Sequence, residues 1–197
     1  DLAVDLARLC TDSAAAHRNA RDNPGALALC DRAIEILEGR ERQAETLLVL
    51  ALAWLDRSAV LLALRDRAAV DAAERALTLV EGVVAIDALP RYLSALAGAC
   101  LSAASTRAAD GNPEGSLALD ERAISLCEGL VRQHKDPEYA LRLAEAWHSK
   151  GKHLSALGDE QAAWRCCDTA RKHCSRISRR RNYEPADVLE ARAALNE

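Results

Sequence analysis

The chain has 197 residues, of which 41 are alanine, nine glycine and five proline, and it contains neither phenylalanine nor methionine. This composition favours helix throughout, with a core built from leucine, alanine, valine and isoleucine. The formal charge of −4 is modest and indicates no particular partner. No stretch of about 18 apolar residues is free of charge, so the sequence predicts no membrane span.

The first residue bears on the origin of the chain, and the cysteines bear on its cellular compartment. Residue 1 is aspartate rather than methionine, so we interpret the chain as a piece trimmed from a longer protein. The seven cysteines are an odd number and lie inside helix-patterned segments. We therefore expect reduced thiols in a cytoplasmic protein.

Turn signals divide the chain into nine expected helices. Asn23-Pro24-Gly25, Gly39-Arg40, Arg65-Asp66, Asp110-Gly111-Asn112-Pro113 and Gly158-Asp159 interrupt the helical periodicity. Pro90, Pro137 and Pro185 each suit the first turn of a helix. The expected helices cover about residues 1–20, 25–39, 42–63, 67–84, 90–109, 114–133, 137–157, 160–177 and 185–197.

A five-residue block returns four times along the chain. It reads LARLC from Leu6, LALAW from Leu50, LAGAC from Leu96 and LAEAW from Leu143. A pair of small residues seven apart follows each block at a nearly constant distance: Ala26/Ala33, Ala69/Ala76, Ser116/Ala123 and Ala163/Ala170. Such regular repetition predicts one solenoid domain over residues 1–197, built from stacked helical hairpins. The hairpins are expected at about 1–40, 41–86, 88–134 and 136–178, followed by a terminal helix at 185–197.

The fourth unit resembles the tetratricopeptide repeat (TPR). Trp147, Gly151, Ala163 and Ala170 fall on the large, glycine and paired small positions of that family. The other units depart from it, because Ala14, Ser58 and Ala104 replace the glycine and the period is longer than the usual 34 residues. The resemblance implies an all-α, right-handed superhelical solenoid of a long-repeat bacterial type. An armadillo- or HEAT-like stack is the alternative, since its period also fits.

The resemblance also implies where a ligand would bind. In TPR arrays the first helix of each hairpin lines an inner groove, and the corresponding positions here are apolar in the middle and polar or basic at the ends. That pattern fits an extended peptide or an amphipathic helix with an acidic group. In the alternative interpretation, the leucines of the second unit pack against neighbouring helices and close the groove. The expected groove residues are Arg8, Thr11, Arg18, Leu52, Leu55, Leu62, Leu101, Ser105, Glu145, His148, Lys152 and Ser155.

Most cysteines recur at equivalent repeat positions, which indicates packing rather than chemistry. His153, Cys166, Cys167, His173 and Cys174 gather in the last hairpin, but the tight spacing typical of a zinc site is missing. Acidic residues such as Asp120 lie at helical spacing from arginines and are interpreted as solvated helix faces. We therefore expect no metal, although a metal- or small-molecule-binding role for this hairpin is the weaker alternative.

Two further features bear on function. The chain lacks a nucleophile elbow, a glycine-rich phosphate loop and a zinc-protease sequence, so no enzyme and no cofactor are expected. The run from Arg171 to Arg181 contains six basic residues and no acidic one. It could contact nucleic acid, but a helix end or a basic linker is the favoured interpretation. The leading hypothesis is a non-catalytic protein- or peptide-binding module, the sensor or scaffold segment of a larger bacterial signalling protein.

Overall fold

The computed structural model describes residues 1–40 and 43–181, with side chains up to residue 175. This part of the chain contains eight α-helices and no strand. The helices are α1 (Leu2–Asn19), α2 (Asn23–Leu37), α3 (Ala44–Ala63), α4 (Ala68–Ile86), α5 (Pro90–Ala109), α6 (Pro113–Gln133), α7 (Pro137–Ala156) and α8 (Glu160–Arg181). The predicted all-α solenoid is confirmed, and the helix expected at 185–197 lies outside the described residues.

The helix boundaries follow the turn signals of the sequence. The side chains of Asp22 and Asn112 accept hydrogen bonds from the amides of Gly25 and Gly115, which caps the N-termini of α2 and α6. The turn inside each hairpin contains one residue with positive φ, namely Arg21, Arg65, Gly111 or Gly158. Of the two interpretations of the basic run, the structure shows the helix end and not the linker, because α8 continues to Arg181, beyond the end expected at about 177.

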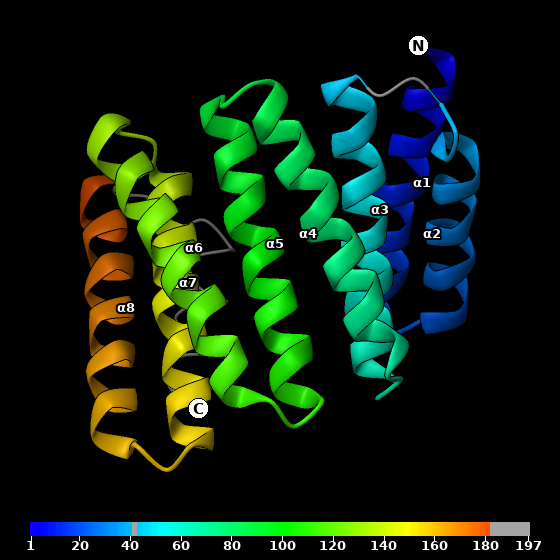
Figure 1. Cartoon of the computed structure of the whole chain (residues 1–197). Coiled ribbons are helices and arrows are strands. Elements are labelled where there is room, and N and C mark those ends of the chain that lie inside the picture. Colours follow the sequence, from blue (N-terminus) through cyan, green and yellow to red (C-terminus); the bar gives the residue numbers. More distant parts are fainter. Residues whose placement is uncertain (41–42, 182–197) are drawn as a thin grey trace.

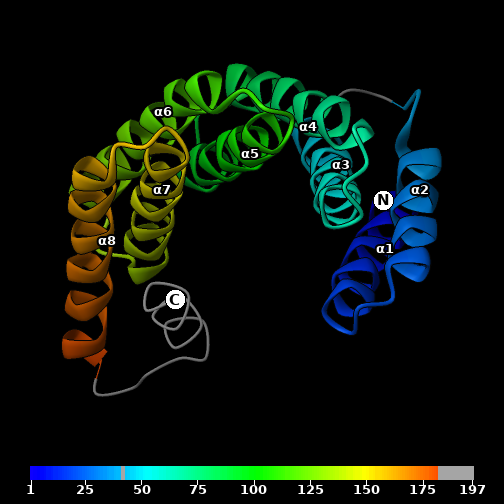
Figure 2. The same cartoon turned by 90° about the horizontal axis from the view of Figure 1, so that it is seen from below.

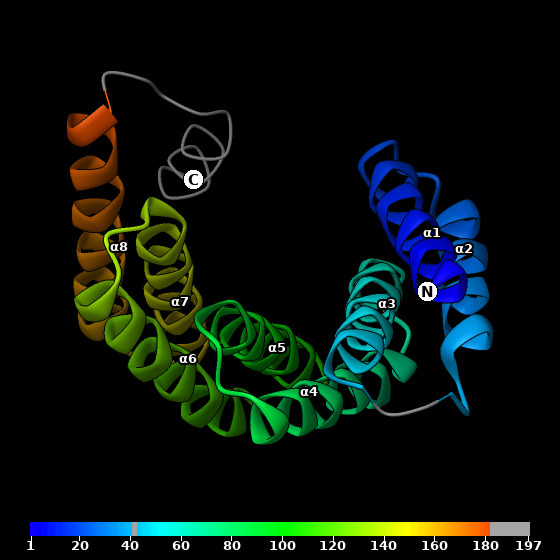
Figure 3. The same cartoon turned by 90° about the horizontal axis from the view of Figure 1, so that it is seen from above.

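Successive helices pair as antiparallel hairpins, and the hairpins stack into an arc (Figures 1 and 2). Helices α1, α3, α5 and α7 line the inner side of the arc, while α2, α4, α6 and α8 form the outer layer (Figure 3). Neighbouring inner helices contact one another, as α1 does α3 and α5 does α7. The first helix of every hairpin therefore faces the interior of the arc, as the TPR resemblance implied.

Small side chains hold the two helices of each hairpin close together. All eight of the paired small residues are buried. A Cβ atom added to Gly151 would lie 2.9 Å from Sγ of Cys167 and 3.2 Å from the carbonyl oxygen of Ala163. The equivalent residues Ala14, Ser58 and Ala104 are also buried. The glycine position of the repeat is therefore a point of close approach between helices.

The two recurring tryptophans connect adjacent parts of the core. Trp54 packs against a cluster from α1, α2 and α3 and also against a cluster formed by Leu61, Ala69 and Ala72. Trp147 packs against the central cluster of α3 to α7 and against Ala170 and Cys174 of α8. Each large side chain therefore joins two core clusters, which makes the stack continuous.

Helix α3 is long and apolar enough to cross a membrane by length and composition alone, with a window of mean hydropathy 1.8. The expectation of no such segment was therefore too strict, because it required a stretch without any charge. In the fold, α3 contacts α1, α2, α4 and α5. Its apolar character is accounted for by this central position in the stack, since core helices pass the same test.

Candidate functional site

The groove residues expected from the repeat lie on α1, α3, α5 and α7, and the cations at the N-terminal end are paired with acidic side chains. Arg8 of α1 pairs with Glu45 of α3. Arg18 pairs with Asp56 at 2.7 Å, again from α1 to α3. Burial raises the pKa of Asp56, and the guanidinium of Arg18 opposes this shift. These arginines fix α1 against α3 and are already matched by acidic side chains.

Thr11 contributes little surface to this end. Its side chain is buried, and its hydroxyl donates a hydrogen bond to the carbonyl of Arg8 at 2.8 Å. The hydroxyl is therefore already paired within α1. This differs from the expectation of an exposed groove residue, because α1 buries this part of its surface when it packs in the first hairpin.

The leucines at the middle of the face are mostly used for packing between helices. Leu55 of α3 and Leu101 of α5 lie against the central core cluster, and Leu62 lies against the cluster containing Leu61. Leu52 differs, because it is 38% exposed. Ser105 of α5 is half-buried. Three of these leucines therefore pack between helices, and Leu52 remains exposed.

Helix α7 supplies the C-terminal end of the face. Glu145 accepts a hydrogen bond from Arg142 at 2.9 Å. One turn further on, His148 is half-buried, and its Nδ1 atom has no hydrogen-bond partner among the described residues. Burial, and to a smaller degree the cation of Lys152, lowers the pKa of His148.

Lys152 itself is exposed and forms no ion pair with any residue that the structure describes. Ser155, two turns beyond His148 and also exposed, donates a hydrogen bond to Glu160 at 2.9 Å. The inner face therefore ends in a cation that no acidic side chain of the described residues offsets. It lies on the same helix as a histidine nitrogen that lacks a hydrogen-bond partner.

The cysteines behave as core residues. Burial raises the pKa of Cys30 and Cys127 to about 12 and that of Cys100 to about 11. In the last hairpin, Cys166 and Cys174 are buried. No group of three or more histidine, cysteine or acidic side chains that could hold a metal is found among residues 1–40 and 43–181. This geometry gives no support to the alternative of a metal site.

The basic run offers no unpaired cation where its side chains are described. Arg171 and Lys172 both pair with Asp168 of the same helix, at 2.5 and 2.6 Å. Residues 176–181 continue α8 as helix. In the described part of this segment, the two cations therefore share one carboxylate of their own helix.

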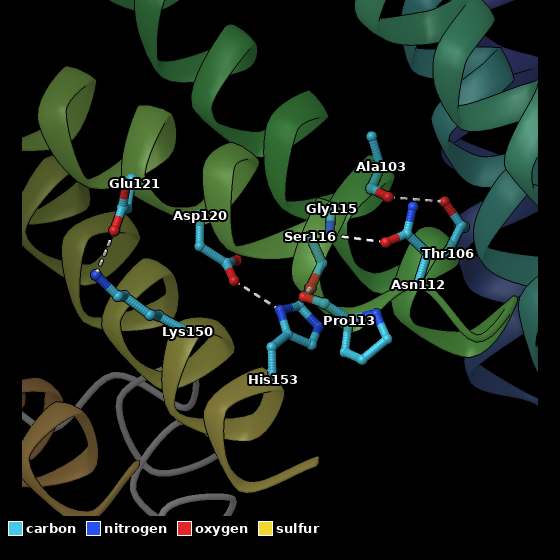
Figure 4. A network of polar contacts seen from close by, with 10 residues as sticks. All are labelled: Ala103, Thr106, Asn112, Pro113, Gly115, Ser116, Asp120, Glu121, Lys150 and His153. Carbon is cyan, nitrogen blue, oxygen red and sulfur yellow. Dashed lines mark hydrogen bonds and ion pairs between the residues drawn. The ribbon is translucent and has the colours of Figure 1, made fainter. Parts of the chain in front are cut away.

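Sequence reasoning missed a buried polar pair between the third and fourth hairpins. Nδ1 of His153 on α7 donates a hydrogen bond to Oδ2 of Asp120 on α6 at 2.6 Å, and both side chains are buried (Figure 4). The interpretation of Asp120 as part of a solvated face is wrong. The repeat position of Asp120 could have indicated its burial, because the equivalent residues in the other units are Cys30, Ala73 and Cys167.

A related ion pair recurs at every junction between hairpins. The fifth residue after the first small residue of the outer helix is always acidic. In three units it pairs with a cation on the next inner helix: Asp31 with Arg57, Glu74 with Arg107 and Glu121 with Lys150. In the last unit the equivalent Asp168 pairs within its own helix. From the sequence we expected such acidic residues to pair within their own helix, whereas three of them connect successive hairpins.

Comparison with known proteins supports the fold. No protein-family model and no curated protein matches the chain. The crystal structure of BtubC (BKLC) from P. vanneervenii has a TM-score of 0.68 and 18% sequence identity, over 91% of this chain and 66% of that chain. A kinesin light chain of Podosopora anserina with nearly identical TPR-like repeats has a TM-score of 0.43 and 16% identity, over 91% of this chain and 99% of that one.

The likeness to BtubC concerns the arrangement of helices alone, and this chain spans just under two thirds of that structure. Together with the buried register of small residues, it shows a TPR-like helical-repeat fold. The paired small positions and the close contact at Gly151 occur where the TPR resemblance located them.

Proposed function

We propose that this chain is a non-catalytic protein-interaction module that holds an extended peptide or an amphipathic helix of a partner on the inner face of α3, α5 and α7. Helical-repeat folds present extended concave surfaces suited to such ligands. The proposal includes a cytoplasmic role as the sensor or scaffold segment of a larger bacterial signalling protein.

One observation carries the choice of ligand. The arginines at the N-terminal end of the face are matched by Glu45 and Asp56, whereas Lys152 at the other end has no acidic counterpart among the described residues. The Nδ1 atom of the half-buried His148, one turn before it, is itself buried and so is not offered to a ligand. An acidic group of the ligand near α7 would pair with Lys152, while an apolar side chain would cover Leu52.

The test begins with a random peptide library displayed on phage and selected against the wild-type chain. Recovered peptides are synthesised, and their affinity is measured by fluorescence anisotropy for wild type, Lys152→Glu and Leu52→Gln. We expect acidic and apolar residues in the recovered peptides. Each variant should bind at least roughly tenfold more weakly, since tenfold corresponds to about 1.4 kcal/mol.

Matched controls separate the inner face from general effects. Arg132→Glu makes the same charge change on an exposed residue of the outer helix α6, and Leu64→Gln changes a comparably exposed leucine at the end of α3. Both should bind like wild type. If the selected peptides bind Lys152→Glu and Leu52→Gln as tightly as the controls, the inner face is not the binding site.

A further inference from the structure

The first helix exposes a line of apolar and small side chains on the side away from α2. Leu2, Leu6 and Leu9 are 84%, 45% and 63% exposed, and Ser13 and Ala16 are exposed as well. These five residues, named here the α1 seam, are spaced alternately four and three apart. That spacing places them along one face of the helix, with the period that helices use when they pair side by side.

The same repeat positions are buried in every other unit. The residues equivalent to Leu6 are Leu50, Leu96 and Leu143, and those equivalent to Leu9 are Ala53, Ala99 and Ala146, all of which are buried. They belong to clusters that include the preceding outer helix, as Ile34 of α2 does for Leu50 and Leu77 of α4 does for Leu96. At each junction between hairpins, the preceding outer helix therefore covers this face.

The face of α1 differs from the internal junctions at the position of Leu9. Leu9 stands where the three internal junctions have a fully buried alanine, and the larger side chain would hold the incoming helix further away. The opposite end of the same chain does not fit this face. Arg171 of α8 occupies the position of Ile34, Leu77 and Ile124, so a second copy stacked end to end would place an arginine against the leucines.

Charges beside the seam indicate the chemistry of its partner. Asp5 and Asp12 are exposed and lie on one flank, each one residue before a seam position, with the Asp5 carboxylate 3.8 Å from the amino group of Asp1. Arg8 also precedes a seam position, but it pairs with Glu45 of α3. The other flank carries Cys10 and His17. An antiparallel pair of identical seams would bring the acidic flanks together, which is unfavourable. Basic residues opposite Asp5 and Asp12 would be favourable.

We propose that the α1 seam is a second docking surface, distinct from the inner face, for a basic amphipathic helix of a partner protein. The partner helix would carry apolar residues at heptad spacing against Leu2, Leu6 and Leu9. Lysine or arginine residues would flank that stripe and face Asp5 and Asp12. Such a helix would give α1 the apolar cover that the preceding hairpin gives to α3, α5 and α7.

The probes are two synthetic helical peptides of about 21 residues, a length chosen because isolated helices shorter than ~12–15 residues are marginal in water. Both carry leucine at the a and d positions. The basic peptide has lysine at the flanking e and g positions, and the acidic peptide has glutamate there. Affinities for the 197-residue chain are measured by fluorescence anisotropy, below the concentration at which the peptides self-associate.

We expect the basic peptide to bind wild type at least roughly tenfold more tightly than the acidic one, and to weaken as salt is added. Leu6→Glu should abolish binding, while Leu64→Glu, an equally exposed leucine on α3, should not. The double variant Asp5→Lys with Asp12→Lys should reverse the preference between the peptides. That reversal also tests the proposal if Leu6→Glu perturbs folding, which circular dichroism would reveal.

Any of four results would overturn the proposal. Neither peptide binds wild type, or both bind with equal affinity, or the reversal of charge leaves the preference unchanged. Self-association of wild type in analytical ultracentrifugation that is lost in Leu6→Glu would assign the seam to a second copy and would equally overturn it. None of these outcomes depends on the inner face.

Discussion

His153 of α7 donates a hydrogen bond from Nδ1 to Oδ2 of Asp120 on α6 at 2.6 Å, in the interior of the third junction between hairpins. Oδ1 of Asp120 is buried and has no hydrogen-bond partner among the described residues. The equivalent pairs at the other junctions are Cys30 with Val60 and Ala73 with Thr106. One junction of the solenoid therefore contains a polar pair where the others are apolar or nearly so.

Removing one member of this pair should destabilise the chain strongly. His153→Val or Asp120→Cys leaves the other polar group buried without its partner, at an expected cost of about 3–5 kcal/mol in free energy of unfolding. The double variant recreates the Cys30 and Val60 combination of the first junction and should recover most of that loss. Urea unfolding followed by circular dichroism measures all three. Additive losses in the double variant would show that the two residues act independently.

Gly151 should not tolerate a methyl group. The Cβ of alanine would meet Sγ of Cys167 at 2.9 Å and the carbonyl of Ala163 at 3.2 Å, so α7 and α8 would have to separate. We expect Gly151→Ala to lose about 1–3 kcal/mol by overpacking. Gly129→Ala is the matched control, because Gly129 lies inside α6 with nothing within 4 Å of the added atom. It should be stabilised by about 0.4–1 kcal/mol. Thermal unfolding of both variants checks the sign of each change.

Gly151 and Asp120 show which contacts can be predicted from the sequence and which cannot. The small residues of the repeat recur in register, and burial follows from register, so the hairpins and the close approach at Gly151 could be predicted. Asp120 was misinterpreted because it was grouped with acidic residues that pair along their own helix, although Arg122, two residues on, lies on another side of α6. Which side chain it meets depends on the stacking of the next hairpin, and periodicity within one helix carries no information about that.

The groove residues illustrate the same limit. Lys152 and Leu52 are exposed as expected, whereas Thr11 is buried and Arg8 and Arg18 pair with acidic residues of α3. The TPR resemblance identifies which helices lie on the inner side of the arc but does not specify how closely adjacent inner helices approach. Contacts between α1 and α3, and between α3 and α5, decide which of these side chains remain available.

Stability should fall in mild acid partly because of His148. Burial lowers its pKa below the value of 6.5 that applies in the unfolded chain, so the unfolded state binds the proton more readily. The resulting loss begins as the pH falls through 6.5 and is complete below the lowered pKa of the folded state. His148→Asn should flatten this part of the profile of unfolding free energy against pH. An unchanged slope between about pH 7 and pH 5 would contradict the assignment to His148.

The thiols should divide into two classes when the folded chain reacts with a thiol reagent. Burial raises the pKa of Cys30, Cys100 and Cys127 to between about 11 and 12, so these thiols carry almost no thiolate near neutral pH and are inaccessible as well. Cys10 occupies the same repeat position as Cys100 but is only half-buried. We expect Cys10 to react well before Cys100, by peptide mapping after timed alkylation at pH 8. In urea above the unfolding transition the two rates should converge, and equal rates in the folded chain would show that the first hairpin packs no more loosely than the third.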